Sequence, residues 1–310
     1  MNCSAELKEV GSKKKKEEVY GVEVVDGINS RLINDRYRLD NFIVGPSTQL
    51  AHAACEAVGR RPGASYNPLY IYGNVGLGKT HLLQGTANTI KDRHKDLKVV
   101  YTTADRFLTD YVGSIKNRSI DKLRDKYRAI DVLVIDDVQF LAGKDQTQQE
   151  LYNIFNILYE AGKQIILSGD RPPKELTNLE PRLTSRFEWG ITVDVGEPDF
   201  ETRLAILQTK AQSREFIIGQ DVAEFIAEHV TTNVREIEGI LNQVIAEYDL
   251  RGIPPTKENV AIRLSKLSVK SLTRTLEQVA TKTLRSANCS YEDLIQAVSE
   301  HFGIEIKNLI

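Results

Sequence analysis

Short apolar runs alternate with segments of helical spacing through the first two thirds of the chain. The runs that predict strands are Leu69–Tyr72, Val99–Thr102, Val132–Ile135, Ile165–Ser168 and Ile191–Val195. Between them, apolar residues recur every three or four positions, as in Leu82, Leu83, Ala87 and Ile90, and predict helices. Short apolar strands that alternate with helices predict an α/β fold, in which helices cover both faces of a parallel sheet.

The alternation of strands and helices stops after Pro198, and the chain as a whole divides into four segments. Residues 1–36 are polar and aperiodic around the run Lys13–Lys16, which favours a disordered tail over a nucleic-acid-binding arm. Residues 37–200 form the expected α/β nucleotide-binding domain, and residues 201–267 have helical spacing throughout and predict a helical lid. Residues 268–310 are expected to hold a linker helix and the start of a further helical domain. In that last part, Ser290 and Asp293 form a capping box for a helix that ends at Gly303.

Composition narrows the class of protein. The chain has 310 residues, 41% of them hydrophobic and 27% charged, as expected of a globular protein with more than one domain. A net charge of −2 excludes a protein that coats nucleic acid through its overall charge, so any such contact must be local. The three cysteines are far apart, which predicts neither a disulfide framework nor a metal site. We find no signal peptide and no apolar run long enough to span a membrane, so a cytoplasmic location is expected.

A phosphate-binding loop follows the first strand of the domain. Residues 73–80 fit the pattern G-x-x-x-x-G-K-[ST], with a buried strand before them and an amphipathic helix after them. Glycines let the backbone N–H groups wrap phosphates, and the helix N-terminus attracts anions. Lys79 is expected to reach the outer phosphates of ATP, and the Thr80 hydroxyl to hold Mg²⁺. The expected nucleotide-binding residues are Gly73, Asn74, Val75, Gly76, Leu77, Gly78, Lys79, Thr80 and His81.

A pair of acids supplies the second half of the site. Asp136 and Asp137 end the strand Val132–Ile135, and ligands of open α/β sheets bind at the carboxyl ends of the strands. Asp136 is expected to hold Mg²⁺, and Asp137 to orient or deprotonate the attacking water.

Several motifs together resemble the bacterial DnaA replication initiators, which are AAA+ ATPases. Beside the phosphate loop, these are VLVIDDVQFL at 132–141, IILSGDR at 165–171, RLTSRFEWG at 182–190 and NVREIEG at 233–239. The resemblance runs from about Tyr37 to about Leu267 and implies an ATP-dependent initiator of chromosomal replication. Such a protein assembles head to tail on origin DNA, promotes duplex opening and is switched off by slow ATP hydrolysis. Asp137 stands where AAA+ proteins usually carry glutamate, which fits a weak ATPase.

The resemblance also implies roles for single residues. Asp170 falls at the sensor-1 position, and Arg186 at the arginine finger that reaches the ATP of a neighbouring subunit. Arg182 falls at the adjacent arginine position one helical turn away, and Arg235 at sensor 2 in the lid. The residues themselves agree, since an arginine supplied by a second subunit stabilises the charge of phosphoryl transfer. Asn233 and Glu236 predict an N-terminal cap that sets Arg235 in the first turn of its helix.

Single-stranded DNA is the partner that the resemblance implies for the core, through Val112, Lys144 and Thr147. Gln146 stands where many relatives carry arginine, which removes one backbone contact, and Thr48 stands where relatives often carry asparagine. The helix that would read duplex DNA is expected to lie outside this sequence. The resemblance further implies contacts with the replicative helicase and with acidic phospholipids.

Three alternatives compete with an initiator. A DnaA-related regulatory AAA+ protein has the same core without duplex recognition, and the stretch from Tyr291 to Ile310, which resembles an interrupted DNA-binding domain, argues against it. A helicase loader is a related AAA+ adaptor, whereas the two helices predicted at 104–115 and 120–127 are typical of initiators. A metabolic P-loop kinase would lack the helical lid with Arg235.

Overall fold

The computed structural model describes residues 22–25, 28–31 and 33–265 of the chain, with side chains from residue 33 onward. Two compact units are present. The first extends to Thr202 and also includes Thr232–Arg235, and the second comprises Arg203–Thr231 and the residues from Glu236 onward. The N-terminal tail up to residue 21, the C-terminal linker from 268 and the capping box at Ser290 lie outside the described residues.

A five-stranded parallel sheet forms the centre of the first unit. In chain order the strands are β3 (Leu69–Tyr72), β4 (Val99–Thr103), β5 (Val132–Asp136), β6 (Gln164–Gly169) and β7 (Ile191–Asp194). They lie side by side in the order β4-β5-β6-β3-β7. Because all five run in the same direction, the residues that follow β3, β5 and β6 meet at one edge of the sheet. This edge holds the phosphate loop, Asp136, Asp137 and Asp170.

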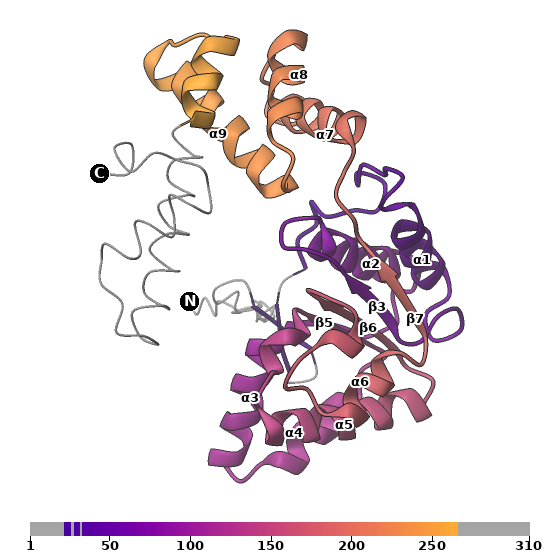
Figure 1. Cartoon of the computed structure of the whole chain (residues 1–310). Coiled ribbons are helices and arrows are strands. Elements are labelled where there is room, and N and C mark those ends of the chain that lie inside the picture. Colours follow the sequence, from indigo (N-terminus) through magenta and orange to yellow (C-terminus); the bar gives the residue numbers. More distant parts are fainter. Residues whose placement is uncertain (1–21, 26–27, 32, 266–310) are drawn as a thin grey trace, which may run out of the picture. The chain divides into compact units, whose positions relative to one another are not determined.

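Two layers of helices cover this sheet, as Figure 1 shows. On one face lie α1 (Gln49–Arg60) and α2 (Lys79–Arg93). On the other face lie α3 (Ala104–Lys116), α4 (Ile120–Arg128), α5 (Asp145–Glu160) and α6 (Pro181–Phe187). The short 3₁₀ helices are η1 (Val138–Leu141) and η2 (Pro173–Glu175).

Alternation along β5 explains the two hydrophobic cores. Val132 and Val134 are buried on the side of α1 and α2, whereas Leu133 and Ile135 are buried on the opposite side. Successive strand residues point to opposite faces of a sheet, so a strand covered on both faces is apolar at successive positions, as in Val132–Ile135. Each buried Val, Leu or Ile side chain contributes ~1.5–3 kcal/mol, which makes this strand a stable support for the acids at its end.

Two paired strands lie in the segment that was expected to be disordered. Strands β1 (Val22–Val25) and β2 (Ile28–Arg31) pair antiparallel, so the expectation of disorder through residue 36 is wrong for these residues. The sequence between them is Asp26-Gly27, a dipeptide typical of two-residue hairpin turns. The β-branched residues on both sides favour strands.

Helices form the second unit, as the change of pattern after Pro198 predicts. It contains most of α7 (Phe200–Gln212), α8 (Gln220–His229), most of α9 (Val234–Arg251) and a helical stretch at 257–265. Leu207, Ile226, Ile237 and Leu241 lie in its hydrophobic core. None of the helices within the described part of the chain is long and apolar enough to cross a membrane.

Candidate functional site: a phosphate loop and its surroundings

The phosphate loop connects β3 to α2 and depends on glycine at two of its turns. Gly78 stands at the N-terminal cap of α2 with φ +103°, and Gly76 has φ +82°. Residues that carry a side chain rarely adopt such φ values. In addition, a Cβ on Gly76 would lie 2.9 Å from Oδ1 of Asn233. The first turn of α2 carries no acidic residue, so its own side chains leave the positive end of the helix dipole uncompensated.

Lys79 folds back over the loop. Its Nζ donates to the carbonyl oxygens of Gly73 at 2.7 Å and Asn74 at 3.0 Å, and the residue is only 7% exposed. Burial lowers the pKa of this ammonium group, and the nearby Asp137, Asp136 and Asp170 partly oppose that effect. The loop therefore holds a buried cation next to the helix N-terminus, which is an environment that attracts anions.

Asp136 is the most buried acid of the site, at 2% exposure. Its Oδ2 accepts hydrogen bonds from the Thr80 hydroxyl at 2.7 Å and from the Tyr101 hydroxyl at 2.9 Å. Its Oδ1 accepts a hydrogen bond from the Ser168 hydroxyl. These donors come from α2, β4 and β6, so the carboxylate is held from three sides.

Asp137 lies beside Asp136 but has a different backbone. Its φ of 61° and ψ of 54° are in the left-handed region, which aspartate tolerates better than most residues. The backbone N–H donates to the Ser168 hydroxyl oxygen at 2.9 Å, and Gln139 Nε2 donates to Oδ1 at 3.1 Å. Ser168 thus contacts both acids. Sequence reasoning missed Ser168, Tyr101 and Gln139, although Ser168 is visible as the polar residue that ends the apolar run of β6.

Two residues from other parts of the sequence interact electrostatically with Lys79 of the phosphate loop. Asp170 follows β6, pairs with Arg171 at 3.3 Å and raises the pKa of Lys79. Arg235 lies in the first turn of α9, as the predicted cap at Asn233 requires, and it contributes to lowering the pKa of Lys79. The N–H of Val234 donates to Gly76 O at 3.1 Å, so the start of α9 contacts the loop directly.

Arg182 and Arg186 have different surroundings. The Arg186 guanidinium carbon lies 3.5 Å from the centre of the Trp189 ring and 5.5 Å from that of Tyr152, whose hydroxyl accepts a 3.4 Å hydrogen bond from Nη2. This contact lowers the pKa of the Tyr152 phenol. Arg182 contacts Glu180 and Gln149 and lies 5.2 Å from the Tyr152 ring centre. The contacts described for these two arginines all lie on α5, α6 and the adjoining loops, rather than at this chain's phosphate loop.

His81 and Thr48 each hold part of the segment that precedes α1. His81 Nε2 lies 2.9 Å from Arg38 O and 2.9 Å from Asn41 Oδ1, and its ring packs against Phe42. The Thr48 hydroxyl accepts a hydrogen bond from Gly45 N at 3.0 Å and donates to Gly45 O at 3.2 Å. Thr48 therefore closes a turn, and His81 attaches the segment at 38–42 to the start of α2.

The three residues expected to contact single-stranded DNA differ in exposure. Val112 on α3 and Lys144 directly before α5 are exposed, whereas Thr147 is only 3% exposed. Thr147 precedes Leu151 and Ile154 by four and seven residues and shares their buried helix face. Its side chain is therefore not accessible to a DNA strand in this structure.

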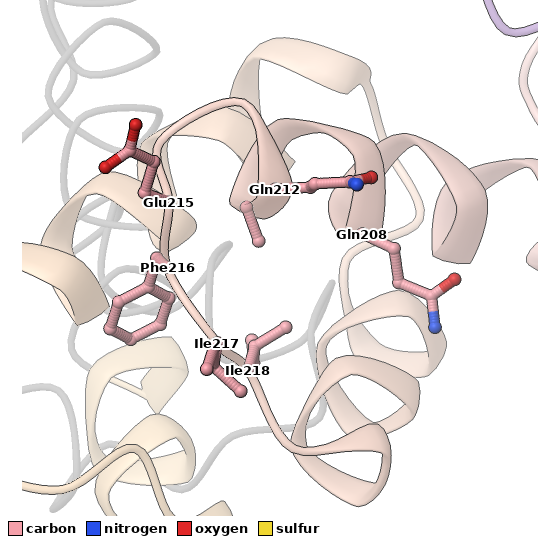
Figure 2. A pocket seen from close by; sticks show the side chains of 7 residues that line it. Gln208, Gln212, Glu215, Phe216, Ile217 and Ile218 are labelled. Carbon is pink, nitrogen blue, oxygen red and sulfur yellow. The ribbon is translucent and has the colours of Figure 1, made fainter.

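A separate hollow of about 310 Å³ lies in the second unit, where the end of α7 faces the segment at 215–218 (Figure 2). It is lined by Gln208, Ala211, Gln212, Glu215, Phe216, Ile217 and Ile218. No lysine or arginine is among these seven residues, so the hollow lacks the positive charge of a phosphate site.

Comparison with known families gives one match that covers more than half of the chain. Residues 33–194 match the bacterial DnaA ATPase domain. The chromosomal replication initiator protein DnaA of Chloroflexus aurantiacus is 44% identical over 293 residues, which cover 94% of this chain and 58% of that protein. The corresponding protein of Caldanaerobacter subterraneus subsp. tengcongensis is 45% identical over 263 residues, which cover 84% of this chain and 58% of that protein. The chain thus spans about 58% of the length of these relatives.

Solved structures agree with this match. Domain III of the Thermotoga maritima replication initiation protein DnaA superposes with a TM-score of 0.72 at 40% identity, covering 75% of this chain and 97% of that one. A replication initiator DnaA bound to AMPPCP and single-stranded DNA superposes with a TM-score of 0.66 at 36% identity, covering 85% of this chain and 77% of that one. The RuvB branch migration motor of Thermotoga maritima, at 19% identity and a TM-score of 0.59 over 88% of this chain and 86% of that one, shares the fold alone.

Proposed function

This chain belongs to the bacterial DnaA ATPase family, and on that basis we propose that it binds ATP and Mg²⁺ and acts as an ATP-dependent initiator of chromosomal replication. In the ATP-bound form it assembles head to tail and holds origin DNA open. One observation carries the proposal: Lys79, the Thr80–Asp136 pair and Arg235 gather around a single phosphate loop. The relative bound to AMPPCP and single-stranded DNA supports it.

Lys79 binds the outer phosphates in this proposal. Its ammonium group already donates to two carbonyl oxygens of the loop. Phosphate oxygens can take the place of these carbonyls, so binding requires no further burial of the cation. A charge-assisted hydrogen bond to phosphate is worth ~1.5–3 kcal/mol. Arg235, in the first turn of α9, contacts the same nucleotide and adds a second positive charge.

The residues at Thr80 and Asp136 fit Mg²⁺. A hydroxyl oxygen and a carboxylate oxygen lie 2.7 Å apart there, and Mg²⁺ prefers such oxygen ligands. Within the described residues, no group of three or more His, Cys, Asp or Glu side chains gathers, so phosphates and water would complete the coordination. When bound, the ion neutralises charge on the phosphates during hydrolysis.

Asp137 serves as the residue that orients or deprotonates the attacking water. Gln139 and Ser168 hold it through its carboxylate and its backbone N–H, respectively. Aspartate is one methylene shorter than glutamate and leaves a longer gap to the water, so hydrolysis is slow and acts as a switch. Asp170 contacts the region of the terminal phosphate from the neighbouring strand.

Assembly depends on Arg186 and Arg182, whose described contacts lie on α5, α6 and the adjoining loops rather than at this chain's own phosphate loop. Arg186 reaches the ATP of a second copy and links nucleotide state to assembly, with Arg182 beside it. Single-stranded DNA then contacts Val112 and Lys144 along the assembled subunits. Because a net charge of −2 provides little attraction from one copy, strand binding requires many copies joined by ATP.

The pair of helices α3 and α4 favours an initiator over a helicase loader, since two helices between β4 and β5 are the feature expected of initiators. A DnaA-related regulatory protein is the remaining alternative. It differs in that it would stimulate hydrolysis by another AAA+ protein rather than hold a DNA strand itself.

Fluorescence anisotropy with a labelled single strand tests this proposal. We expect strand binding in ATP but much weaker binding in ADP, and loss of binding in Arg186→Ala. Lys144→Ala should weaken binding and lower the slope of log affinity against log salt by about 0.7, the value for one single-strand phosphate contact. Lys95→Ala is the control, because Lys95 is exposed and precedes β4 at the opposite edge of the sheet. Equal binding in ATP and ADP would contradict the switch.

A further inference from the structure

Arg186 is stacked on an aromatic ring that is itself half exposed. Trp189 is 51% exposed, and the guanidinium carbon of Arg186 lies 3.5 Å from the centre of its ring. On α5, Tyr152 presents its ring at 5.5 Å from the same carbon and accepts the 3.4 Å hydrogen bond. Two aromatic side chains from different parts of the chain therefore hold one half-buried cation.

A row of aromatic rings supports this stack. Trp189 packs edge to face on Tyr159 at 5.1 Å between ring centres, Tyr159 stacks on Phe155 at 6.0 Å, and Phe155 and Phe187 are both buried. This row of rings connects the exposed stack to the core under α5 and α6.

Hydrogen bonds from a buried side chain hold the start of α6. The buried amide of Gln148 accepts a hydrogen bond from Glu180 N at 2.7 Å and donates to the carbonyls of Leu141 and Asn178. Glu180 is the N-terminal cap of α6, so the helix that carries Arg186 begins at a fixed point.

Stacking leaves the hydrogen-bonding capacity of an arginine intact. A guanidinium group is attracted to a ring through its flat face, whereas its five N–H donors lie in its plane and point outward. An arginine held in this way keeps its donors available and has already lost much of its side-chain freedom. The loss of that freedom otherwise opposes binding.

We propose that Trp189 and Tyr152 are positioning residues for Arg186, which hold its guanidinium group ready for a phosphate group bound by a second copy of this chain. The proposal rests on the function proposed above and adds residues for which no role is assigned there. Trp189 supplies the face on which the cation lies, and Tyr152 fixes its rotation through the hydroxyl group. This role requires Trp189 to be exposed, because the stack must lie at the surface to contact a second copy.

Tryptophan fluorescence tests the stack by itself. Trp189 is the single tryptophan of the chain, so emission and acrylamide quenching report on this position alone. Arg186→Ala should shift the emission to longer wavelength and increase quenching, because water and quencher reach the uncovered face. Arg182→Ala is the matched control, since Arg182 lies over Tyr152 and should leave the signal unchanged. The same emission and quenching in Arg186→Ala and the unaltered protein would overturn the proposal.

Assembly tests the consequence of the stack. Trp189→Leu should raise the protein concentration needed for ATP-dependent assembly about fivefold, which corresponds to ~1 kcal/mol for a partly exposed cation–π contact. Trp189→Phe keeps an aromatic face, so the concentration that it needs for assembly should lie between those of the unaltered protein and Trp189→Leu. Each variant should bind ATP as the unaltered protein does. In an Arg186→Ala background, Trp189→Leu should add nothing further.

Two outcomes separate this proposal from the one it rests on. If Arg186→Ala loses assembly while Trp189→Leu assembles normally, the positioning role is wrong and the function proposed above stands. If Arg186→Ala itself assembles normally with ATP, the intersubunit role of Arg186 is wrong, and the positioning role is wrong with it. If Trp189→Leu weakens assembly equally in the presence and in the absence of the Arg186 side chain, Trp189 is an ordinary interface contact and the positioning role is wrong.

Discussion

Ser168→Ala is the substitution whose effect can be worked out most fully from the structure. The Ser168 hydroxyl donates to Asp136 and accepts from the N–H of Asp137, and the residue is fully buried. The variant loses one hydrogen bond to a charged group, worth ~1.5–3 kcal/mol, and leaves a buried N–H without its partner, which costs ~1–3 kcal/mol. Because the two effects share one hydroxyl, we expect a combined loss of about 3 kcal/mol rather than their full sum.

Ser114→Ala provides the matched control. Ser114 is also buried, and the same hydroxyl is removed, but it donates only to the carbonyl of Tyr111 at 2.7 Å within α3. A hydrogen bond between uncharged groups contributes about 0.5–1.5 kcal/mol. The two variants therefore differ in the charge of the partner and in the second bond that Ser168 accepts.

Thermal unfolding followed by circular dichroism measures both variants. For a domain of 150–250 residues, 1 kcal/mol shifts Tm by roughly 2–4 °C, so Ser168→Ala should lower Tm by about 6–12 °C and Ser114→Ala by less than half of that. The transition to follow is that of the unit containing the sheet, because a chain with two units does not unfold as a single two-state system. An equal Tm for the two variants would refute the reasoning that Ser168 joins the acids.

Two further predictions concern the nucleotide and a buried thiol. Lys79→Ala should weaken ATP binding tenfold or more, the scale of one charge-assisted phosphate contact of ~1.5–3 kcal/mol, and calorimetric titration would measure it. Unchanged affinity would place the nucleotide elsewhere. Burial raises the pKa of Cys55 to about 12, so its thiol should resist iodoacetamide at pH 8 in the native protein and react once urea unfolds it, as peptide mass spectrometry would show. Since the unperturbed value is 9.0, the stability that Cys55 contributes as a neutral thiol is complete below pH 9 and is lost as pH rises toward 12.

Local patterns in the sequence predicted much of the fold. The strand at Val132–Ile135 and the loop at 73–80 lie where they were expected, because a buried parallel strand and a glycine-rich turn each have a signal within a few residues. The strand pair at 22–25 and 28–31 had a local signal as well, because Asp26-Gly27 stands between the strands in the sequence, but the charged residues before it outweighed this signal. Thr147 is a similar case, since its spacing from Leu151 places it on the buried face of α5.

Other features were decided by the tertiary structure. Ser168, Tyr101 and Thr80 meet at Asp136 only because β4, β5 and β6 are neighbours and α2 begins at the same edge of the sheet. Trp189 lies under Arg186 only because α6 ends against α5, where Tyr159 supports the ring. Periodicity within one segment specifies which face of that segment is buried. It does not specify which other segment covers that face, because the order of strands in a sheet follows from the packing of the whole unit.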